Sequence, residues 1–308
     1  MSKYQDVSHR GVEVFAKELA ERLMQSHQVD IITAGDFPSF KKIILGKYDV
    51  VIPLNGRFQS FLISWGRYFF GYKVLISGHS GIGRDDIWNI VVARPNVFVA
   101  LTDKAEKWAK KFGWGLSIIR IYNGIDLRKF KPDGERKNLP LPKPVILSVG
   151  ALSWYKHHER VIKAVARVKK GSLLIVGVGD QQEKLQGMGS NLLKGRFAIS
   201  DYPYYEMPKL YRSVDLFTLP SWDREAFGIV YLEAMASNLP VVAPDDANRR
   251  EIIGDAGFYV SDTTNEDEYA DKIEKALAKK WDNLPRKQAE HFSWDKIALE
   301  YETLLRTL

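Results

Sequence analysis

Two glutamates, Glu225 and Glu233, bracket the mostly apolar stretch EAFGIVYLE. The stretch follows a strand-like segment that ends in Pro220–Ser221, and it runs on into a helix-like segment. Open α/β sheets bind ligands where the carboxyl end of a strand leads into a helix. Gly228 lets the backbone approach a ligand closely, and the N–H groups at a helix start favour a phosphate. A carboxylate at Glu233, inside the helix, suits the vicinal hydroxyls of a ribose.

This arrangement predicts a ligand made of a nucleoside, a diphosphate and a further group. Glu233 would contact the nucleoside, and Glu225, which precedes the helix, would lie nearer the diphosphate and the attached group. The alternative is that Glu225 is a loop charge and Glu233 a solvated helix position. The apolar neighbours of Glu233 weigh against this alternative, because a charge among them needs a partner.

The elements that must position these residues alternate along the chain. Short β-branched runs that are apolar on both faces are followed by amphipathic segments, which is typical of parallel α/β sheets. The predicted strands are residues 29–33, 48–54, 73–77, 97–101, 117–121, 145–149, 172–176, 215–219, 240–243 and 258–260. The predicted helices are residues 12–24, 58–70, 86–93, 103–112, 157–168, 181–187, 205–211, 228–236 and 266–279.

A segment rich in proline and charge, residues 129–143, separates two sets of elements. It predicts a linker between two doubly wound domains, residues 1–143 (with the linker) and residues 144–290. The last helix, within residues 291–308, has Ser293 as its expected N-cap and Asp295 in its first turn. No strand follows this helix, so we expect it to pack on a domain already formed.

The net charge of +7 is unevenly distributed over the 308 residues. Residues 1–143 hold 23 Lys and Arg against 14 Asp and Glu (+9), and residues 144–308 hold 22 against 24 (−2). The basic front half predicts an anionic partner, which is nucleic acid, a lipid surface or a phosphorylated acceptor, unless the charge serves only solubility. The chain has no cysteine, which excludes disulfides and thiolate sites and fits a cytoplasmic protein. It has no apolar run that could span a bilayer and no apolar signal core.

The segment LPSWDREAFGIVYLEAMASNLPVVAPD resembles the donor-site signature of retaining GT-B glycosyltransferases of glycosyltransferase family 4, the group 1 transferases. The resemblance continues in GVEVFAKELAERL, YNGIDLRKFKP, LSVGALSWYKHHERVIKA, LLIVGVGDQQEKL and FSWDKIALEYETLL, and so covers nearly the whole chain. It implies two Rossmann-like domains that face each other across a cleft, with the C-terminal helix crossing back to the first domain. It also implies an enzyme that moves a sugar from a nucleotide-diphosphate-sugar donor to a hydroxyl acceptor with retention of configuration.

The resemblance implies roles for individual residues. It places Glu225 on the donor sugar and Glu233 on the ribose. Lys156 would neutralise the departing diphosphate, where negative charge develops, and His79 would lie near the anomeric centre and the acceptor. The expected catalytic residues are His79, Glu225 and Lys156, and the expected donor-binding residues are Gly11, Lys156, Phe227, Gly228, Ile229 and Glu233.

The sequence departs from the family pattern at several positions. Ala151 stands where an arginine often assists the lysine, so one phosphate contact is missing. Ala247 and Asn248 replace two usual glycines, ahead of Arg249 and Arg250, either of which is a candidate for the lost positive charge. The glycine-rich loop near the N-terminus is reduced to Gly11, and the expected first strand is only KYQDVS.

No Asp-x-Asp occurs in the chain, so a metal-bound diphosphate is not expected, and no cofactor is expected either. Lys156 and the helix start would take over the role of the cation. The resemblance implies same-face substitution, in which the leaving phosphate helps to deprotonate the acceptor. We therefore expect a metal-independent transferase that acts in glycan, glycolipid or polysaccharide synthesis.

The aromatic and basic segment 57–73 allows two interpretations. It is either a helix sandwiched in the core, which the flanking strands favour, or an interfacial patch for a membrane or a lipid-linked acceptor, with Arg57, Arg67 and Lys73 near its ends. The second interpretation would place a cytoplasmic enzyme at the inner face of the cell membrane.

Two other classes of function remain open. A sugar-nucleotide epimerase or a phosphorylase can use the same fold. A non-catalytic nucleic-acid-binding protein would account for the basic front half, but it leaves the two glutamates unexplained and no such motif stands out, so no nucleic-acid partner is expected.

Overall fold

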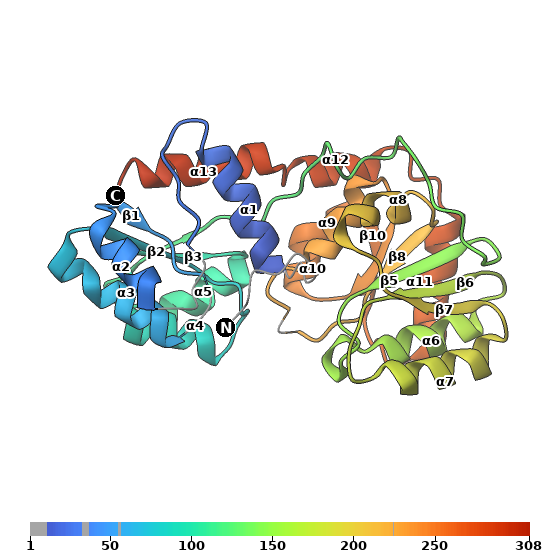
Figure 1. Cartoon of the computed structure of the whole chain (residues 1–308). Helices are drawn as coiled ribbons and strands as arrows, with labels where there is room; N and C mark the ends of the chain where they lie inside the picture. The colour runs from blue at the N-terminus through green and yellow to red at the C-terminus, as the bar shows by residue number, and fades with distance from the viewer. Residues whose placement is uncertain (1–10, 33–36, 55–56, 224) are drawn as a thin grey trace. The chain divides into compact units, whose positions relative to one another are not determined.

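The computed structural model of the chain describes residues 11–32, 37–54, 57–223 and 225–308 (Figure 1). They form two compact units, each described here by itself. Unit 1 lies within residues 1–124, 224–227 and 294–308, and unit 2 within residues 125–223 and 228–293. Each unit holds a sheet of parallel strands with helices, which is the predicted α/β class.

The sheet of unit 1 has the order β1-β2-β3-β4, and every neighbouring pair is parallel. All of β3 and all of β2 after Lys73 are buried, so both faces of the central strands are covered. This is why the strands read as continuous apolar runs rather than as alternating ones. The strands are β1 (Val50–Val51), β2 (Lys73–Ser77), β3 (Val97–Ala100) and β4 (Ser117–Arg120).

The helices of unit 1 begin and end at local signals. Thr102 caps α5, because its hydroxyl accepts a hydrogen bond of 3.2 Å from the Ala105 N–H. The segment 86–93, expected as one α-helix, is a short α-helix that continues as a π-helix. The helices are α1 (Gly11–Leu23), α2 (Phe37–Leu45), α3 (Arg57–Phe70), α4 (Arg84–Trp88), the π-helix η1 (Asn89–Ala93), α5 (Asp103–Phe112) and α13 (Trp294–Leu305).

The last helix, α13, belongs to unit 1 although unit 2 precedes it in the chain. Its Trp294 and Tyr301 pack on Phe15 of α1, with ring centroids 5.6 and 5.8 Å away. A Cβ on Gly124 would lie 2.4 Å from the Trp294 ring, so this close approach requires glycine. The C-terminal helix therefore crosses back to the first unit, as predicted.

The sheet of unit 2 has the order β10-β9-β8-β5-β6-β7 and is parallel throughout. From β5 the chain adds β6 and β7 on one side, and then β8, β9 and β10 on the other. The strand order thus reverses between β5 and β8, where a doubly wound sheet has its ligand crevice. The strands are β5 (Val145–Val149), β6 (Ser172–Val176), β7 (Phe197–Ser200), β8 (Leu216–Thr218), β9 (Val241–Pro244) and β10 (Gly257–Val260).

Helices cover both faces of this sheet (Figure 1). The apolar side of α6, including Val161 and Val165, joins Ile175 of the sheet and Ile273 of α11 in one buried cluster. The α-helices are α6 (His158–Arg167), α7 (Gln182–Leu193), α8 (Met207–Tyr211), α9 (Ile229–Ala236), α10 (Ala247–Ile253), α11 (Glu266–Ala278) and α12 (Leu284–Glu290). Short 3-10 helices are η2 (Trp154–Lys156), η3 (Tyr204–Glu206) and η4 (Gly254–Ala256).

The segment expected to be a linker packs on unit 2. Arg286 donates hydrogen bonds to the carbonyl oxygens of Phe130 at 2.6 Å and Leu127 at 3.0 Å. The Lys137 N–H donates to the Ser213 hydroxyl at 2.6 Å. The division between the units consequently falls after residue 124 rather than after residue 143.

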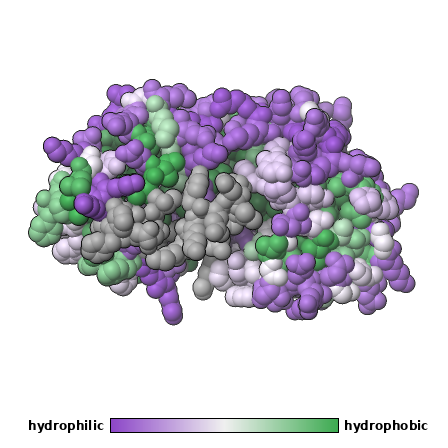
Figure 2. All heavy atoms as spheres, in the orientation of Figure 1, coloured by the Kyte–Doolittle hydropathy of each residue, from purple (hydrophilic) through white to green (hydrophobic). Residues whose placement is uncertain are grey.

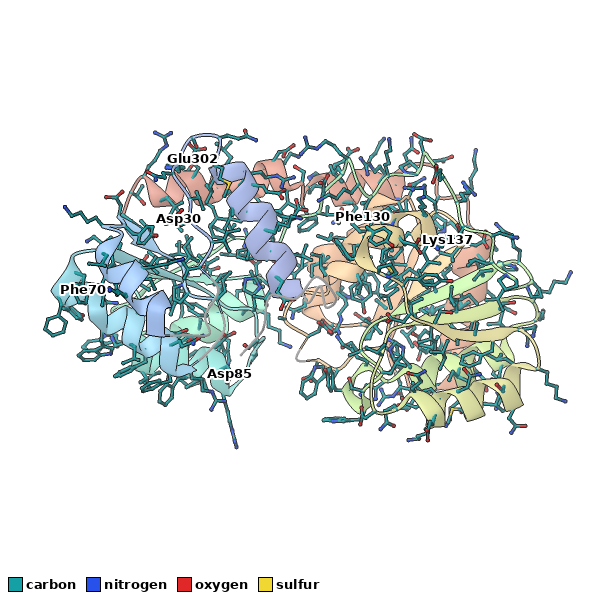
Figure 3. The ribbon with its side chains drawn as sticks, viewed as in Figure 1. Asp30, Phe70, Asp85, Phe130, Lys137 and Glu302 are labelled. Carbon is teal, nitrogen blue, oxygen red and sulfur yellow. The ribbon has the colours of Figure 1, made fainter. Side chains whose placement is uncertain are left out.

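Helix α3 does not lie sandwiched in the core, so that interpretation is wrong. It buries only Ser60, Ile63 and Ser64, whereas Phe69 is 83% exposed. Figure 3 shows Phe70 at the outer margin of unit 1, and Figure 2 shows hydrophobic residues on the surface there. The helix packs one narrow face on the unit and leaves its aromatic face in solvent.

Other differences concern short elements. Residues 29–32 form no strand, and the expected first strand KYQDVS lies outside the described residues. The elements β7, α2, α10 and α12 were not predicted.

Candidate functional site

The switch point of unit 2 is flanked by the loops that follow β5 and β8. The loop after β5 contains Gly150 and the 3-10 helix η2, which ends at Lys156. The loop after β8 leads through Ser221 and Trp222 toward Gly228 and α9. Four of the predicted donor-binding residues, Lys156, Gly228, Ile229 and Glu233, therefore belong to the same edge of one sheet.

Glycines hold the loop that carries Lys156 close to its neighbour. A Cβ on Gly177 would lie 2.0 Å from the Gly150 carbonyl oxygen, and one on Gly179 would lie 2.4 Å from that of Leu152. The Leu152 N–H donates a hydrogen bond of 2.9 Å to the Val178 carbonyl. The two loops can approach this closely only because both positions lack a side chain.

Lys156 itself lies along the start of this loop. A Cβ on Gly150 would be 3.6 Å from the Lys156 Cδ, so the lysine stem packs against the end of β5. The Lys156 ammonium lies 5.7 Å from the centre of the Tyr155 ring. The side chain is thus held at the carboxyl edge of the sheet, where an anion would gain from its charge.

Helix α9 begins at the second loop. Gly228 is its N-cap with φ of +87°, a left-handed conformation that favours glycine. No side chain within the described residues caps this helix start. The N–H groups and the helix dipole at this end are therefore suited to an anion.

Glu233 is buried within α9, with 4% of its surface exposed. Burial raises the pKa of Glu233 to about 7, and hydrogen bonds from Tyr211 and Tyr204 partly offset this rise. The Tyr211 hydroxyl donates to Oε2 of Glu233 at 2.7 Å. The interpretation of Glu233 as a solvated helix position is wrong, because α8 and η3 supply partners that hold the carboxyl in place.

Arg249 organises the loop after β8. Its Nη2 donates to the carbonyl oxygens of Ser221 and Trp222, both at 2.9 Å, and its Nη1 donates to Asp246 at 2.6 Å. Arg250 is exposed and forms an ion pair with Asp245. Arg249 thus serves to hold the loop inside unit 2, while Arg250 is engaged at the surface.

The remaining predicted residues belong to unit 1. Glu225 and Phe227 lie in the short segment assigned to that unit, where the buried Phe227 ring is 6.3 Å from Tyr122. Gly11 is the first residue of α1. His79 follows β2, and its ring lies 4.3 Å from that of Phe15.

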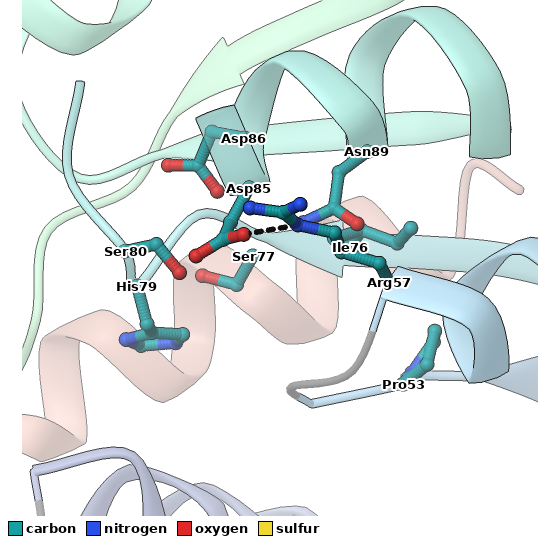
Figure 4. Close-up of a pocket in the computed structure, with 9 residues that line it drawn as sticks. All are labelled: Pro53, Arg57, Ile76, Ser77, His79, Ser80, Asp85, Asp86 and Asn89. Carbon is teal, nitrogen blue, oxygen red and sulfur yellow. Dashed lines mark hydrogen bonds and ion pairs between the residues drawn. The ribbon is translucent and has the colours of Figure 1, made fainter. Parts of the chain in front are cut away.

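His79 is neutral at physiological pH in this environment. Burial lowers the pKa of His79 to about 4. Its Nε2 is buried and has no hydrogen-bond partner among the residues that the structure describes. The ring lines a cavity of about 220 Å³ beside the end of β2 (Figure 4). The imidazole of His79 is therefore held neutral beside this cavity.

Residues 130–292 match the family described as "Glycosyl transferases group 1". This chain belongs to that family. A phosphatidyl-myo-inositol mannosyltransferase of Mycolicibacterium smegmatis is 32% identical over 169 residues, which are 53% of this chain and 43% of that protein. The match thus spans less than half the length of this relative.

Two solved structures share the fold of the chain. Sucrose-phosphate synthase from Thermosynechococcus elongatus matches with a TM-score of 0.80 over 99% of this chain and 96% of that one, at 20% identity. The HepE protein of Anabaena, in complex with UDP and glucose, matches with a TM-score of 0.80 over 99% and 98%, at 18% identity. The fold of this group 1 chain is GT-B.

Some residues of this group 1 chain that bear on the site carry no sequence signal of their own. Asp86 lines the cavity beside His79, but in the sequence it is indistinguishable from an ordinary charged residue near a helix start. Tyr211 is one of several aromatic residues before β8, and nothing in the sequence marks it as the partner of Glu233. Trp154, Tyr155 and Trp222 form a cluster at the carboxyl edge of unit 2, with ring centroids 5.3 to 5.8 Å apart. Only the fold brings these rings from two different loops together.

The described part of this group 1 chain contains no group of three or more His, Cys, Asp or Glu arranged to hold a metal ion. Within the same residues, none of the helices has the length and apolar character needed to cross a bilayer. Metal independence remains a prediction.

Proposed function

We propose that this chain is a retaining glycosyltransferase that binds a nucleotide-diphosphate-sugar at the switch point of unit 2. The observation that carries the proposal is the placement of Lys156, the start of α9 and Glu233 at the same edge of that sheet. The helix start and the lysine would hold the diphosphate, and the Glu233 carboxylate would accept hydrogen bonds from ribose hydroxyls. Family membership supports the assignment.

In the proposed reaction the bond between the anomeric carbon and the diphosphate breaks, and the acceptor oxygen bonds to the same face. The leaving phosphate takes the acceptor proton, while Lys156 and the N–H groups at Gly228 and Ile229 stabilise the charge that develops. Glu225 would hold the sugar. His79 would orient the sugar or the acceptor hydroxyl as a neutral imidazole. No metal ion is needed in this scheme.

The proposed acceptor is lipid-linked or anionic and is met at a membrane surface. The aromatic surface of unit 1 supports this part, and it consists of Trp65, Tyr68, Phe69, Phe70 and Trp114, all exposed. Basic residues connect its members: Arg67 donates to the Arg94 carbonyl at 2.6 Å, and Arg94 donates to the Trp114 carbonyl at 3.0 Å. Exposed aromatics beside arginines suit the headgroup region of an anionic leaflet.

The name of the mycobacterial relative, a phosphatidyl-myo-inositol mannosyltransferase, supports a lipid acceptor as well. Arg57, expected in this surface, instead forms an ion pair with Asp85 beside the cavity. The basic contribution to the surface therefore comes from Arg67, Arg94 and Lys73.

Calorimetry with UDP, GDP and ADP tests the donor site. One of them should bind, and Glu233→Ala should weaken that binding by about 1–3 kcal/mol through loss of charge-assisted hydrogen bonds. Asp271→Ala, at an exposed position of α11, is the control and should bind as the wild type does. Unchanged affinity in a folded Glu233→Ala protein would remove the ribose assignment.

Product analysis separates the transferase from its rivals. A transferase needs an added acceptor to turn over the sugar nucleotide efficiently. Isomerised sugar nucleotide without an acceptor would indicate an epimerase, and sugar phosphate formed from inorganic phosphate would indicate a phosphorylase.

A further inference from the structure

Helix α6 begins with a buried histidine. The buried residues of this helix are His158, Val161, Ile162, Ala164 and Val165, so only the first of the five is polar. His158 is 1% exposed. A buried polar ring costs free energy unless it is hydrogen-bonded, whereas an apolar side chain would pack here without such partners. The histidine therefore has a use beyond filling space only if its nitrogen atoms hold something in place.

The partners of His158 lie at the end of β5. Its Nδ1 is 3.1 Å from the hydroxyl oxygen of Ser148, which is fully buried. Burial lowers the pKa of His158 to about 4, and hydrogen bonding to the backbone of Gly150 and Ala151 partly offsets this change. A neutral imidazole accepts at one nitrogen and donates from the other, so it can serve the hydroxyl and the backbone together. The ring thus ties the first residue of α6 to the end of β5.

The loop between these two points, residues 150–157, carries Lys156, and we call it the Lys156 loop. A Cβ on Gly150 would lie 3.6 Å from Cδ of Lys156 and 3.7 Å from Nε2 of His158. The lysine stem and the histidine ring therefore meet over the same glycine. After burial, the positive charge of Lys156 also lowers the pKa of His158, so the ammonium lies within electrostatic reach of the ring.

The backbone between the two side chains has an uncommon conformation. His157 has φ of +54° and ψ of +36°, in the left-handed region that few residues other than glycine adopt. Such a conformation persists where the surrounding structure fixes it. Earlier in the loop, the Leu152 N–H donates to the Val178 carbonyl at 2.9 Å. The Tyr155 carbonyl accepts a bond of 3.0 Å from the loop after β8. The buried ring at the start of α6 fixes the other end.

We propose that His158 is a positioning residue, which holds the Lys156 loop and so sets how strongly Lys156 acts on the diphosphate of the donor. The inference rests on the proposed function for the diphosphate, but the link between β5 and α6 stands on unit 2 alone. His158 acts through the lysine, because its ring fixes the stem of that side chain and the backbone at Gly150. A neutral ring does this without adding a second charge beside the ammonium.

Hydrogen exchange of the full chain, followed by mass spectrometry, tests whether His158 holds the loop. His158→Leu fills the space but removes both ring nitrogens, and it should speed exchange in residues 151–157 by about tenfold through local opening. His158→Gln, which keeps polar atoms at the end of the side chain, should restore part of the protection. The matched control is Tyr269→Phe, which removes another buried hydrogen bond of unit 2, the contact of 2.6 Å with Thr218. Its Lys156 loop should exchange as in the wild type.

Calorimetry tests the effect on Lys156. The probes are UDP with UMP, GDP with GMP, and ADP with AMP, and the pair that binds is used. The ratio of the two affinities reports on the terminal phosphate, and a general loss of folded protein leaves it unchanged. His158→Leu should lower the preference for the diphosphate by about fivefold, the size expected from one lost hydrogen bond. Lys156→Ala should lower it further, and adding His158→Leu to Lys156→Ala should have no further effect.

Three results would overturn the proposal. The loop of folded His158→Leu protein could exchange as in the wild type, its preference for the diphosphate could be unchanged, or the preference could fall equally with and without Lys156. Ser148→Ala is the second variant if His158→Leu does not fold. It removes only the hydroxyl that faces Nδ1 and should loosen the loop in the same direction by a smaller amount. Normal exchange in Ser148→Ala would count against the proposal as well.

The two measurements separate this inference from the proposed function. If the wild type binds no nucleoside diphosphate, the donor site proposed for unit 2 is wrong, and the exchange data alone decide whether His158 holds the loop. If folded His158→Leu protein binds the diphosphate with the wild-type preference, the donor site stands and only the positioning role fails.

Discussion

The Tyr211 hydroxyl donates a hydrogen bond of 2.7 Å to Oε2 of Glu233, and both side chains are buried in unit 2. The bond joins α8 to α9 and opposes the effect of burial on the carboxyl. Because burial alone would keep Glu233 protonated near neutrality, the tyrosine helps to maintain the carboxylate that a ribose would need.

Tyr211→Phe should therefore weaken nucleoside diphosphate binding, because the pKa of Glu233 rises when the donor is lost. We expect a loss of about 1 kcal/mol, the typical net value of one hydrogen bond. Calorimetry at neutral pH measures it. Tyr205→Phe, at a tyrosine that is 77% exposed, is the matched control and should bind normally. Equal affinity in both variants would contradict the role given to Tyr211.

The pH dependence of stability provides a second prediction. Burial raises the pKa of Asp86 and of Glu233 to about 7 from ordinary values of 3.8 and 4.5. Between about pH 4 and pH 7 the unfolded chain has released protons that the folded protein retains, so these two groups make stability fall as pH rises. Asp86→Asn or Glu233→Gln removes one of these two carboxyls and with it that group's share of the loss of stability. Each variant should gain on the order of 3–4 kcal/mol relative to the wild type between pH 4 and pH 8, the larger gain being that of Asp86→Asn.

Two buried histidines also change the free energy of unfolding over this pH range. The variants are therefore compared with the wild type at each pH, so that the contribution of the histidines cancels. Burial lowers the pKa of both His79 and His158 to about 4, so the unfolded chain binds their protons first as pH falls. Their contribution makes stability rise with pH between about 4 and 6.5, opposite to that of the carboxyls. Urea unfolding at several pH values gives the differences. Variant and wild-type curves that run parallel would contradict the raised pKa values.

Much of the fold could be predicted because local signals agree with the tertiary arrangement. The strands β2, β5 and β6 occupy the predicted residues, since each is a continuous apolar run in a central position of its sheet. Helix α5 also occupies its predicted residues, between the Thr102 cap and Gly113. Edge strand β7 was not predicted, because its apolar run ends at Ile199 after only Phe197 and Ala198, and all four residues of the strand are only partly buried.

The wrong predictions of burial share a physical cause. The spacing of apolar residues along the sequence does not show which other elements cover a given face of a helix. Helix α3 is apolar on more than one side, and the sequence alone could not say that Phe69 and Phe70 face solvent. The reverse holds for Asp86, whose burial depends on Gly78 and Phe98, on a strand end and a neighbouring strand. A ligand site could be predicted from the Glu225–Glu233 stretch, because the glycine, the helix start and the carboxylates all lie within nine residues of the chain.

A third prediction compares substitutions at two neighbouring arginines, Arg249 and Arg250, of which only Arg249 is buried. Arg249→Gln removes a buried guanidinium that holds Asp246 and the carbonyl oxygens of Ser221 and Trp222. It should cost about 3 kcal/mol of unfolding free energy, as expected when one partner of a buried network is removed. Arg250→Gln breaks only an exposed pair with Asp245 and should cost less than about 1 kcal/mol. Similar values from urea unfolding would mean that Arg249 does not hold the loop.

The aromatic surface of unit 1 leads to the last prediction, which concerns membrane attachment. Liposome flotation should show binding that requires anionic lipid and falls with salt, because each basic residue near an anionic leaflet contributes about 1 kcal/mol. Replacing Arg67, Arg94 and Lys73 with glutamine should weaken binding through charge. Phe69→Ser with Phe70→Ser should weaken it through lost contact with the headgroup region.

Two exposed residues outside this surface supply the controls. Leu299→Ser, on α13, removes an apolar side chain that is 62% exposed, and Lys280→Gln removes a charge from unit 2. Both variants should float with anionic vesicles as the wild type does. If all proteins float equally, the attraction comes from the overall positive charge and not from the aromatic surface. If the wild type stays in the aqueous fraction at low salt, the membrane part of the proposal is wrong, while the donor site in unit 2 is unaffected because no residue of this surface belongs to it.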